Sequence, residues 1–309
     1  GLAAPPTVND LLRYVPADAQ VVMSVDTAAL RVHPFIQGWI LEHQAGWTGV
    51  YSDVQRFLSD AGLDPLRDVD LMVVAANPKQ GGGHALALFA GRYDPSSLGA
   101  AIVARGGRAE TVNGVPLYLA REGSTDGAAL ALPSAELVIA GDEAAVRAAL
   151  GSRAAGRTLV GAAVAMGQID LRAPFWLVAL VPDEVRQGAG TAATEVHGEH
   201  ADAVRSVLAA GGTVQRVAMQ ARLDQELTLT GVATTDTAEN AELVRDAVKG
   251  ALAAARLKLG NQEPELVEVL RDVQVQVKDT EVSVQMVIPL PLVEKLSRTA
   301  HHRHGTAEI

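Results

Sequence analysis

A short apolar strand that runs directly into a small helix occurs twice in this chain, and this recurrence constrains the fold more than any other feature. The first copy lies at residues 134–150, where a strand at 136–140 meets Gly141-Asp142 and an alanine-rich helical segment follows. The second copy lies at residues 282–296, near the end of the chain. We interpret the two copies as the closing elements of two similar halves.

The segments that precede these two steps follow one common order. Residues 19–26 and 175–181 are β-prone runs, and each opens a half. Each half then shows the pattern of a helix, two strands, a helix, two or more strands and a closing helix. Asn113-Gly114 indicates a tight hairpin, and consecutive hairpins are typical of antiparallel sheets. The sequence therefore predicts an α+β fold with an internal duplication, in which each half is a mostly antiparallel sheet covered by helices.

Length and composition agree with this division. The chain has 309 residues, 48% of them hydrophobic and 20% charged, which suits a folded chain of about two domains. We expect the first half to span residues 1–155 and the second to span residues 156–300. The His-rich tail at residues 301–309 is expected to be disordered, and residues 188–198, rich in Gly, Ala and Thr, are expected to form a mobile loop.

Charge and cysteine content exclude several classes of function. The formal net charge is −10, and no run of Lys and Arg is interleaved with aromatic residues, so a nucleic-acid partner is not expected. The absence of cysteine removes disulfides, thiolate nucleophiles and Cys-based zinc sites. No stretch reaches the roughly 18–20 apolar residues of a transmembrane span.

Three segments of the first half resemble a group of exported bacterial proteins of unknown function. These segments are the turn VPADA at residues 15–19 with the strand after it, GVPLY at residues 114–118, and LVIAGDEAAVRAAL at residues 137–150. The resemblance covers roughly the first 150 residues and implies a periplasmic or extracellular protein without known catalytic residues. The chain begins without Met, which we interpret as removal of an export signal, and it has no lipobox Cys.

The best metal candidates are His197 and His200, with Glu199 between them. Histidines three apart share one face of a helix, and a carboxylate could complete a zinc set. Gly198 separates them, however, and the order matches neither HExxH nor HxxEH, so we favour a solvated helix start. The histidines of the tail offer only an adventitious ion site.

The remaining motifs predict no cofactor. The glycines at residues 188–193 match G-x-G-x-x-A, but a charged segment separates them from the preceding strand, which a dinucleotide loop does not tolerate. Asp64, Asp68 and Asp70 could attract calcium, although their spacing is not that of an EF-hand. No G-x-S-x-G is present for acyl transfer.

Trp39, Trp47 and Tyr51 recur at helical spacing in a predicted helix that begins at Pro34 and ends near Gly62. Packing against the first sheet is the simplest explanation for these side chains. Because the chain contains only three Trp, this cluster is also a candidate ligand or interface surface.

Together these patterns predict a non-enzymatic, exported interaction or binding module, which acts through a protein surface or a groove between its halves. The first alternative is a carrier of an apolar small molecule or lipid, since a core with 4% aromatic residues under long amphipathic helices can leave a cavity. The second alternative is a metal-dependent hydrolase that uses His197 or His200.

Overall fold

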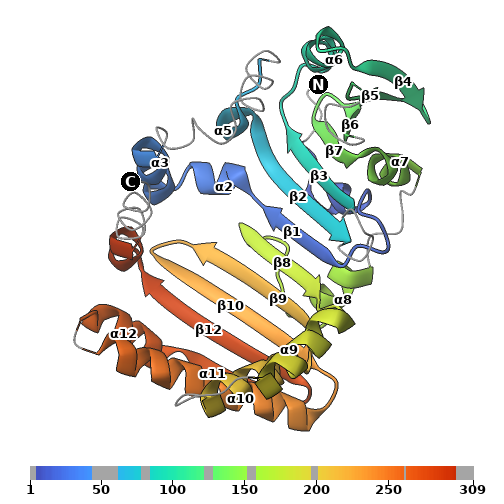
Figure 1. The fold of residues 1–309 in the computed structure, drawn as a ribbon. Coiled ribbons are helices and arrows are strands. Elements are labelled where there is room, and N and C mark those ends of the chain that lie inside the picture. The colour runs from blue at the N-terminus through green and yellow to red at the C-terminus, as the bar shows by residue number, and fades with distance from the viewer. Residues whose placement is uncertain are drawn as a thin grey trace, which may run out of the picture. The chain divides into compact units, whose positions relative to one another are not determined.

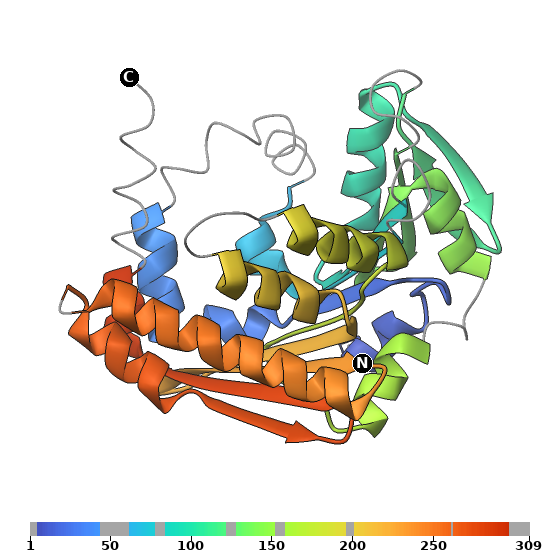
Figure 2. The ribbon, with the colours of Figure 1, turned by 60° about the horizontal axis from the view of Figure 1, so that its bottom comes forward.

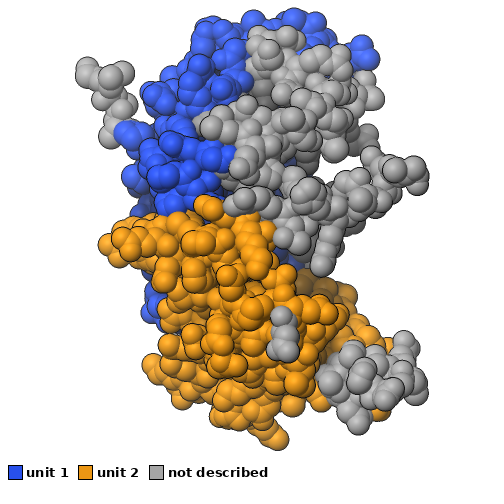
Figure 3. Space-filling view, turned by 90° about the vertical axis from the view of Figure 1, so that its left-hand side faces the viewer, with its two compact units in different colours: residues 1–167, 174–177 blue, residues 168–173, 178–309 orange. Residues whose placement is uncertain are grey.

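A computed structural model of the chain describes residues 5–43, 62–77, 84–121, 128–151, 158–195, 201–260 and 262–296. The chain divides into two compact units (Figure 3). Unit 1 contains residues 1–167 and 174–177, and unit 2 contains residues 168–173 and 178–309. The predicted boundary at residue 155 precedes helix α8 (Thr158–Ala165), which belongs to unit 1.

Unit 1 is built on an antiparallel sheet with the strand order β1-β2-β3-β7-β6-β5-β4 (Figure 1). Strand β8 (Phe175–Leu180) contributes its first residues to this unit and its last residues to unit 2. The elements are α1 (Val8–Leu12), β1 (Val21–Val25), α2 (Thr27–Arg31), α3 (Pro34–His43), α5 (Pro65–Asp68), β2 (Val69–Asn77), β3 (His84–Gly91), α6 (Pro95–Ala104), β4 (Arg108–Val112), β5 (Val115–Leu119), β6 (Ala128–Ser134), β7 (Leu137–Asp142), α7 (Glu143–Gly151) and α8.

Unit 2 has the strand order β11-β12-β10-β9-β8, and its hairpins are also antiparallel. A helical segment at residues 290–296 follows the last strand. The other elements are α9 (Asp183–Glu195), α10 (Ala201–Gly211), β9 (Val214–Leu223), β10 (Glu226–Thr235), α11 (Ala238–Leu259), α12 (Pro264–Asp272), β11 (Gln274–Lys278) and β12 (Glu281–Pro289).

The predicted α+β class with mostly antiparallel strands is confirmed. The order of elements also recurs, because the strand order β1-β2-β3-β7-β6 of unit 1 has the same connectivity as β8-β9-β10-β12-β11 of unit 2. The two sheets differ by the hairpin β4–β5, which is inserted in unit 1 between α6 and β6. This hairpin turns at Asn113-Gly114, where both residues have positive φ (51° and 80°), as a type I′ turn requires.

Helices cover the sheets through small and aliphatic side chains. In unit 1, α1 and α7 pack on the face that carries Val73, Leu88 and Ile139, all of which are fully buried. Helix α6 packs through Leu98 and Ala101 on the opposite face, near the strands β5, β6 and β7. In unit 2, α11 and α12 lie along one face of β10, β11 and β12 (Figure 2).

The expectation of an irregular loop from residue 188 onward is wrong for residues 188–195, which form the C-terminal part of α9. Acidic residues Asp183 and Glu184 occupy the first turn of this helix and complement its dipole, and Arg186 pairs with Asp183. The helix packs mainly on α10, so it does not need the long apolar stripe that the sequence lacks.

Candidate functional site

The sequence-predicted site residues fall mostly outside the described ranges. Trp39 lies in α3, as the helical spacing predicted. Trp47, Tyr51, His197, His200 and the tail at residues 301–309 are not among the described residues. Within the described part, no cluster of at least three His, Asp or Glu side chains is suited to hold a metal ion. Every helix in these ranges is too short or too polar to span a bilayer.

Two of the acidic residues near β2 form ion pairs with arginines. Asp68 accepts hydrogen bonds from Arg67, chiefly through Nε at 2.8 Å, and this bond lowers the pKa of the Asp68 carboxyl. Asp70 accepts a hydrogen bond of 3.2 Å from Nη1 of Arg31. These ion pairs neutralise two of the carboxylates that a calcium ion would need. The Arg31–Asp70 pair fastens α2 to β2, whereas the Arg67–Asp68 pair lies within α5.

Strands β1, β2 and β3 carry apolar side chains on both faces, which is unusual for an antiparallel sheet. One face is fully packed, whereas the side chains of the opposite face stay only partly buried. We call this second set the open face. It consists of Val21, Met23 and Val25 of β1, Met72, Val74 and Ala76 of β2, and Ala87 of β3.

Strand register aligns the open face into a continuous strip. Met23 lies opposite Val74, and Val25 lies opposite Met72, so the two methionines sit on neighbouring strands of one surface. Val74 in turn lies opposite Ala87. Helix α6 covers the continuation of this same face at Phe89 and does not bury the strip itself.

The open face offers no hydrogen-bonding or charged side chain. Its aliphatic and thioether groups can make only apolar contacts, and methionine adapts its shape to different occupants. In unit 2 one face of the sheet carries polar side chains, because Thr230 of β10 lies opposite Gln285 of β12 and Thr228 lies opposite Arg222 of β9. A partly exposed apolar sheet face of this kind is typical of a binding surface rather than of a solvated one.

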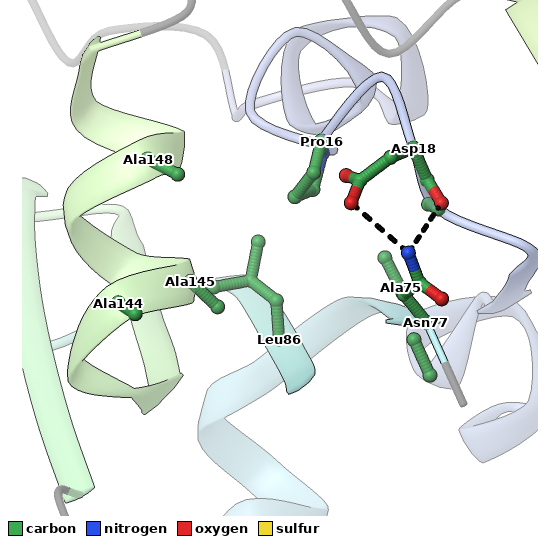
Figure 4. Close-up of a pocket in the computed structure, with 10 residues that line it drawn as sticks. Pro16, Asp18, Ala75, Asn77, Leu86, Ala144, Ala145 and Ala148 are labelled. Atoms are coloured by element: carbon green, nitrogen blue, oxygen red, sulfur yellow. Dashed lines mark hydrogen bonds between the residues drawn. The ribbon is translucent and has the colours of Figure 1, made fainter. Parts of the chain in front are cut away.

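A separate pocket lies in unit 1 at the turn between α1 and β1 (Figure 4). The turn closes with a hydrogen bond from the Ala19 amide to the Pro16 carbonyl at 3.2 Å. Asn77, at the end of β2 and only 9% exposed, donates from Nδ2 to the Asp18 carbonyl at 3.1 Å and to Asp18 Oδ2 at 3.0 Å. These bonds fix the turn and the Asp18 carboxylate against the sheet.

The pocket has a volume of about 200 Å³ and is walled mainly by small apolar side chains. Helix α7 forms one wall, and its first turn is held by Asp142, whose Oδ1 accepts from the Ala145 amide at 2.9 Å. Gly141 lets β7 approach β3, since a Cβ there would lie 2.3 Å from the Ala85 carbonyl oxygen. The lining residues are Pro16, Asp18, Ala19, Ala75, Ala76, Asn77, Leu86, Ala144, Ala145 and Ala148.

A second pocket of unit 1, of about 330 Å³, lies between α1 and the β6–β7 hairpin. Its lining is mixed, with Asp10, Arg13, Ser134 and Glu136 beside Pro6, Tyr14 and Leu137. Neither pocket combines the volume and the apolar lining that a long acyl chain would need.

No family model and no curated protein matches the chain. Among solved structures, crystal form III of TP0453 superposes with a TM-score of 0.50 at 9% identity, over 93% of this chain and 95% of that one. Crystal form IV of the same protein gives a TM-score of 0.46 at 8% identity, over 92% of this chain and 95% of that one. The likeness is one of fold. It carries no information about ligands or activity.

Sequence reasoning did not find the open face or the pocket. A signal for the open face was present, because VVMSV in β1 and LMVVAA in β2 are almost continuously apolar. Such runs indicate strands that are meant to be covered on both faces. The pocket had no comparable signal, since Asp18 and Asn77 are separated by 59 residues.

Proposed function

We propose that this protein is an exported, non-enzymatic binding module that holds an apolar ligand against the open face of unit 1. The observation that carries the proposal is the two-sided apolar character of β1–β3, combined with the incomplete burial of one side. Water contact with these side chains is unfavourable by about 25 cal/mol for each Å² of apolar surface, so an occupant that removes the water is favoured.

The chemistry of the open face favours an aliphatic small molecule or acyl chain over a protein partner. Protein interfaces surround an apolar centre with a polar rim that supplies hydrogen bonds and orientation. The strip around Met23, Met72 and Val74 supplies dispersion contacts alone, which suits a ligand without internal polar groups. A carrier of an apolar ligand is therefore the function we favour.

Export is supported by the resemblance of the first half to exported bacterial proteins, through the VPADA turn and the strand–Gly–helix ending. The turn of that motif positions Asp18 and the ending provides the wall α7 of the pocket, so both motifs have structural roles in unit 1. The hydrolase alternative rests on His197 and His200, which lie outside the described residues.

The proposal is tested with a fluorescent anthroyl-labelled fatty acid titrated into the full chain. Met23→Gln and Val74→Thr keep side-chain volume while adding polarity to the open face, and each should weaken binding about fivefold to tenfold, equivalent to ~1–1.4 kcal/mol. Val287→Thr is the matched control, because Val287 is 39% exposed on β12 of unit 2. It should leave the affinity unchanged.

Mass spectrometry of protein purified from its native host supplies the second measurement. A co-purified aliphatic molecule that is lost in Met23→Gln would support the carrier. If the labelled fatty acid does not bind, and the same two substitutions instead abolish cross-linking to a protein, the open face is a protein-docking surface. Equal fatty-acid affinity for wild type, Met23→Gln and Val74→Thr would disprove the proposal.

A further inference from the structure

We infer that the pocket beside the Pro16–Ala19 turn binds the end of an unbranched aliphatic chain that carries a primary ammonium group. Such a group belongs to a lysine side chain or to a free alkylamine. The pocket lies mainly on the packed face of the sheet, to which Ala75 and Leu86 belong, and Ala76 is the one lining residue that it shares with the open face. The inference does not depend on the proposed function.

The size of the pocket selects a slender group. Its volume of about 200 Å³ lies below the roughly 300–1,000 Å³ of sites for drug-sized molecules. It equals the liquid volume of roughly seven waters, which is enough for a short methylene chain and its terminal atom. Methyl groups of Ala144, Ala145 and Ala148 form the wall on α7 and leave room along the helix.

Among the described residues of the lining, Asp18 is the only one with a charged side chain. Asn77 holds this carboxylate through Oδ2, and in the described part of the chain no Lys, Arg or His pairs with Asp18. Figure 4 shows the carboxylate extending from the turn toward the side of the pocket that α7 lines. A held carboxylate at the edge of an apolar pocket matches a cation on an apolar stem.

The N-terminus of α7 also borders the pocket, but it does not make the pocket favour an anion over a cation. Its positive end is already complemented by Asp142, which caps the Ala145 amide, and by Glu143 in the first turn. Arg147, the nearest cation on that helix, is engaged by Glu143 and Glu110. An anionic group would therefore meet repulsion from Asp18, and no described residue of the lining is a Lys, Arg or His that would offset it.

Amide chemical shifts of the ¹⁵N-labelled full chain provide the test. We would titrate n-butylammonium, n-butanol and butyrate at constant ionic strength and follow the amides of Asp18, Asn77 and Ala145. The expected order of affinity is butylammonium, then butanol, then butyrate, with the ammonium about fivefold tighter than the alcohol. N-acetyl-lysine methylamide forms the last arm, and tighter binding than butylammonium would assign the group to a peptide lysine rather than to a free amine.

Three substitutions distinguish the contribution of the Asp18 charge to binding from that of the shape of the pocket. Asp18→Asn retains an oxygen that can accept from Asn77, so the turn should fold, and the butylammonium affinity should fall to that of butanol. Ala148→Leu, at an exposed position of the pocket wall, should abolish binding of both. Asp246→Asn, on α11 of unit 2, makes the same change in net charge and should have no effect. Unchanged butylammonium affinity in Asp18→Asn, or butyrate binding equal to that of butylammonium, would overturn the inference.

Discussion

The side chains of Gln168 and Glu281 are joined by a hydrogen bond of 2.6 Å from Nε2 to Oε1, although 113 residues separate them in the sequence. The same Nε2 lies 3.2 Å from the hydroxyl of Thr234. Gln168 is only 3% exposed, so its amide is the element that attaches residues 168–173 to β10 and β12 of unit 2.

Two substitutions of Gln168 should measure how much its hydrogen bond contributes to stability and how strongly the Glu281 carboxylate affects this position. Gln168→Leu removes the donor and should lower the free energy of unfolding by about 1–3 kcal/mol. Gln168→Glu places a second carboxylate beside Glu281. Its destabilisation should therefore grow as pH rises above about 4, where the introduced carboxyl ionises in the unfolded chain. Urea unfolding at pH 4 and pH 7 measures both effects.

The control is Gln285→Glu, the same chemical change at an exposed position of β12. It should shift stability by less than about 0.5 kcal/mol at either pH. If Gln168→Glu and Gln285→Glu lose the same free energy of unfolding, burial beside Glu281 is not the cause of the destabilisation.

Gly141 should tolerate no side chain. A Cβ at this position would lie 2.3 Å from the Ala85 carbonyl oxygen and 3.2 Å from Leu86 Cα, both of them backbone atoms that cannot move without displacing β3. Gly141→Ala is expected to lower the free energy of unfolding by about 2 kcal/mol or more. Gly231→Ala in β10, where a Cβ meets nothing within 4 Å, should be neutral or slightly stabilising. Thermal unfolding of Gly141→Ala and Gly231→Ala measures the difference. Similar melting temperatures for the two variants would contradict the close approach of β7 to β3 at Gly141.

Tyr93 carries a buried hydroxyl that has no hydrogen-bond partner in the described part of the chain. Burial raises the pKa of this phenol well above its usual value, and the nearby Asp70 and Asp68 carboxylates add to the effect. Tyr93→Phe removes a polar group that gains nothing from being buried, so the free energy of unfolding should rise by about 1 kcal/mol. Chemical denaturation measures this free energy. If it is lower in Tyr93→Phe than in the wild type, the hydroxyl is instead hydrogen-bonded to water.

Asp170 should make unit 2 sensitive to acid. Its carboxylate accepts hydrogen bonds from Arg172 and, at 2.6 Å, from Arg222, and the Arg172 bonds are the main reason why the pKa of Asp170 lies well below its usual range. A depressed folded-state pKa means that the stabilisation is complete above about pH 4, the value for an unfolded Asp, and is lost as pH falls through the folded-state pKa.

Asp170→Asn should accordingly lower the melting temperature at pH 6 and make a smaller difference below about pH 3. Arg222→Gln should reduce the same pH dependence in part, since the bonds from Arg172 remain. A melting-temperature difference between wild type and Asp170→Asn that does not change from pH 6 to pH 3 would disprove the role of this carboxylate.

Local signals predicted the elements well because they depend on neighbouring residues. Asn113-Gly114 predicted its hairpin, and Pro95 after Asp94 marks the start of α6, where Asp94 accepts from the Ser96 amide. Helix α9 was missed because Gly188 and its neighbours suggest a loop, whereas contact with α10 stabilises the helix. The apolar runs of β1 and β2 were visible, but the sequence does not say which face remains open.

The pocket could not be predicted for a different reason. It requires Asn77 to reach the Asp18 turn and Gly141 to let β7, the strand before α7, approach β3, and each of these is a contact between distant parts of the chain. The turn and the strand–Gly–helix step were both recognised in the sequence. Their convergence on one pocket depends on strand order, which periodicity does not report.

The path of the chain between residues 167 and 178 limits how this protein can be dissected. Residues 168–173 belong to unit 2, whereas residues 174–177, including the fully buried Trp176, belong to unit 1. A recombinant fragment that stops at residue 167 lacks Trp176, and one that begins at residue 178 lacks Gln168 and Asp170. No single cut therefore yields two complete folding units, and an engineered separation would have to supply one of these short segments twice.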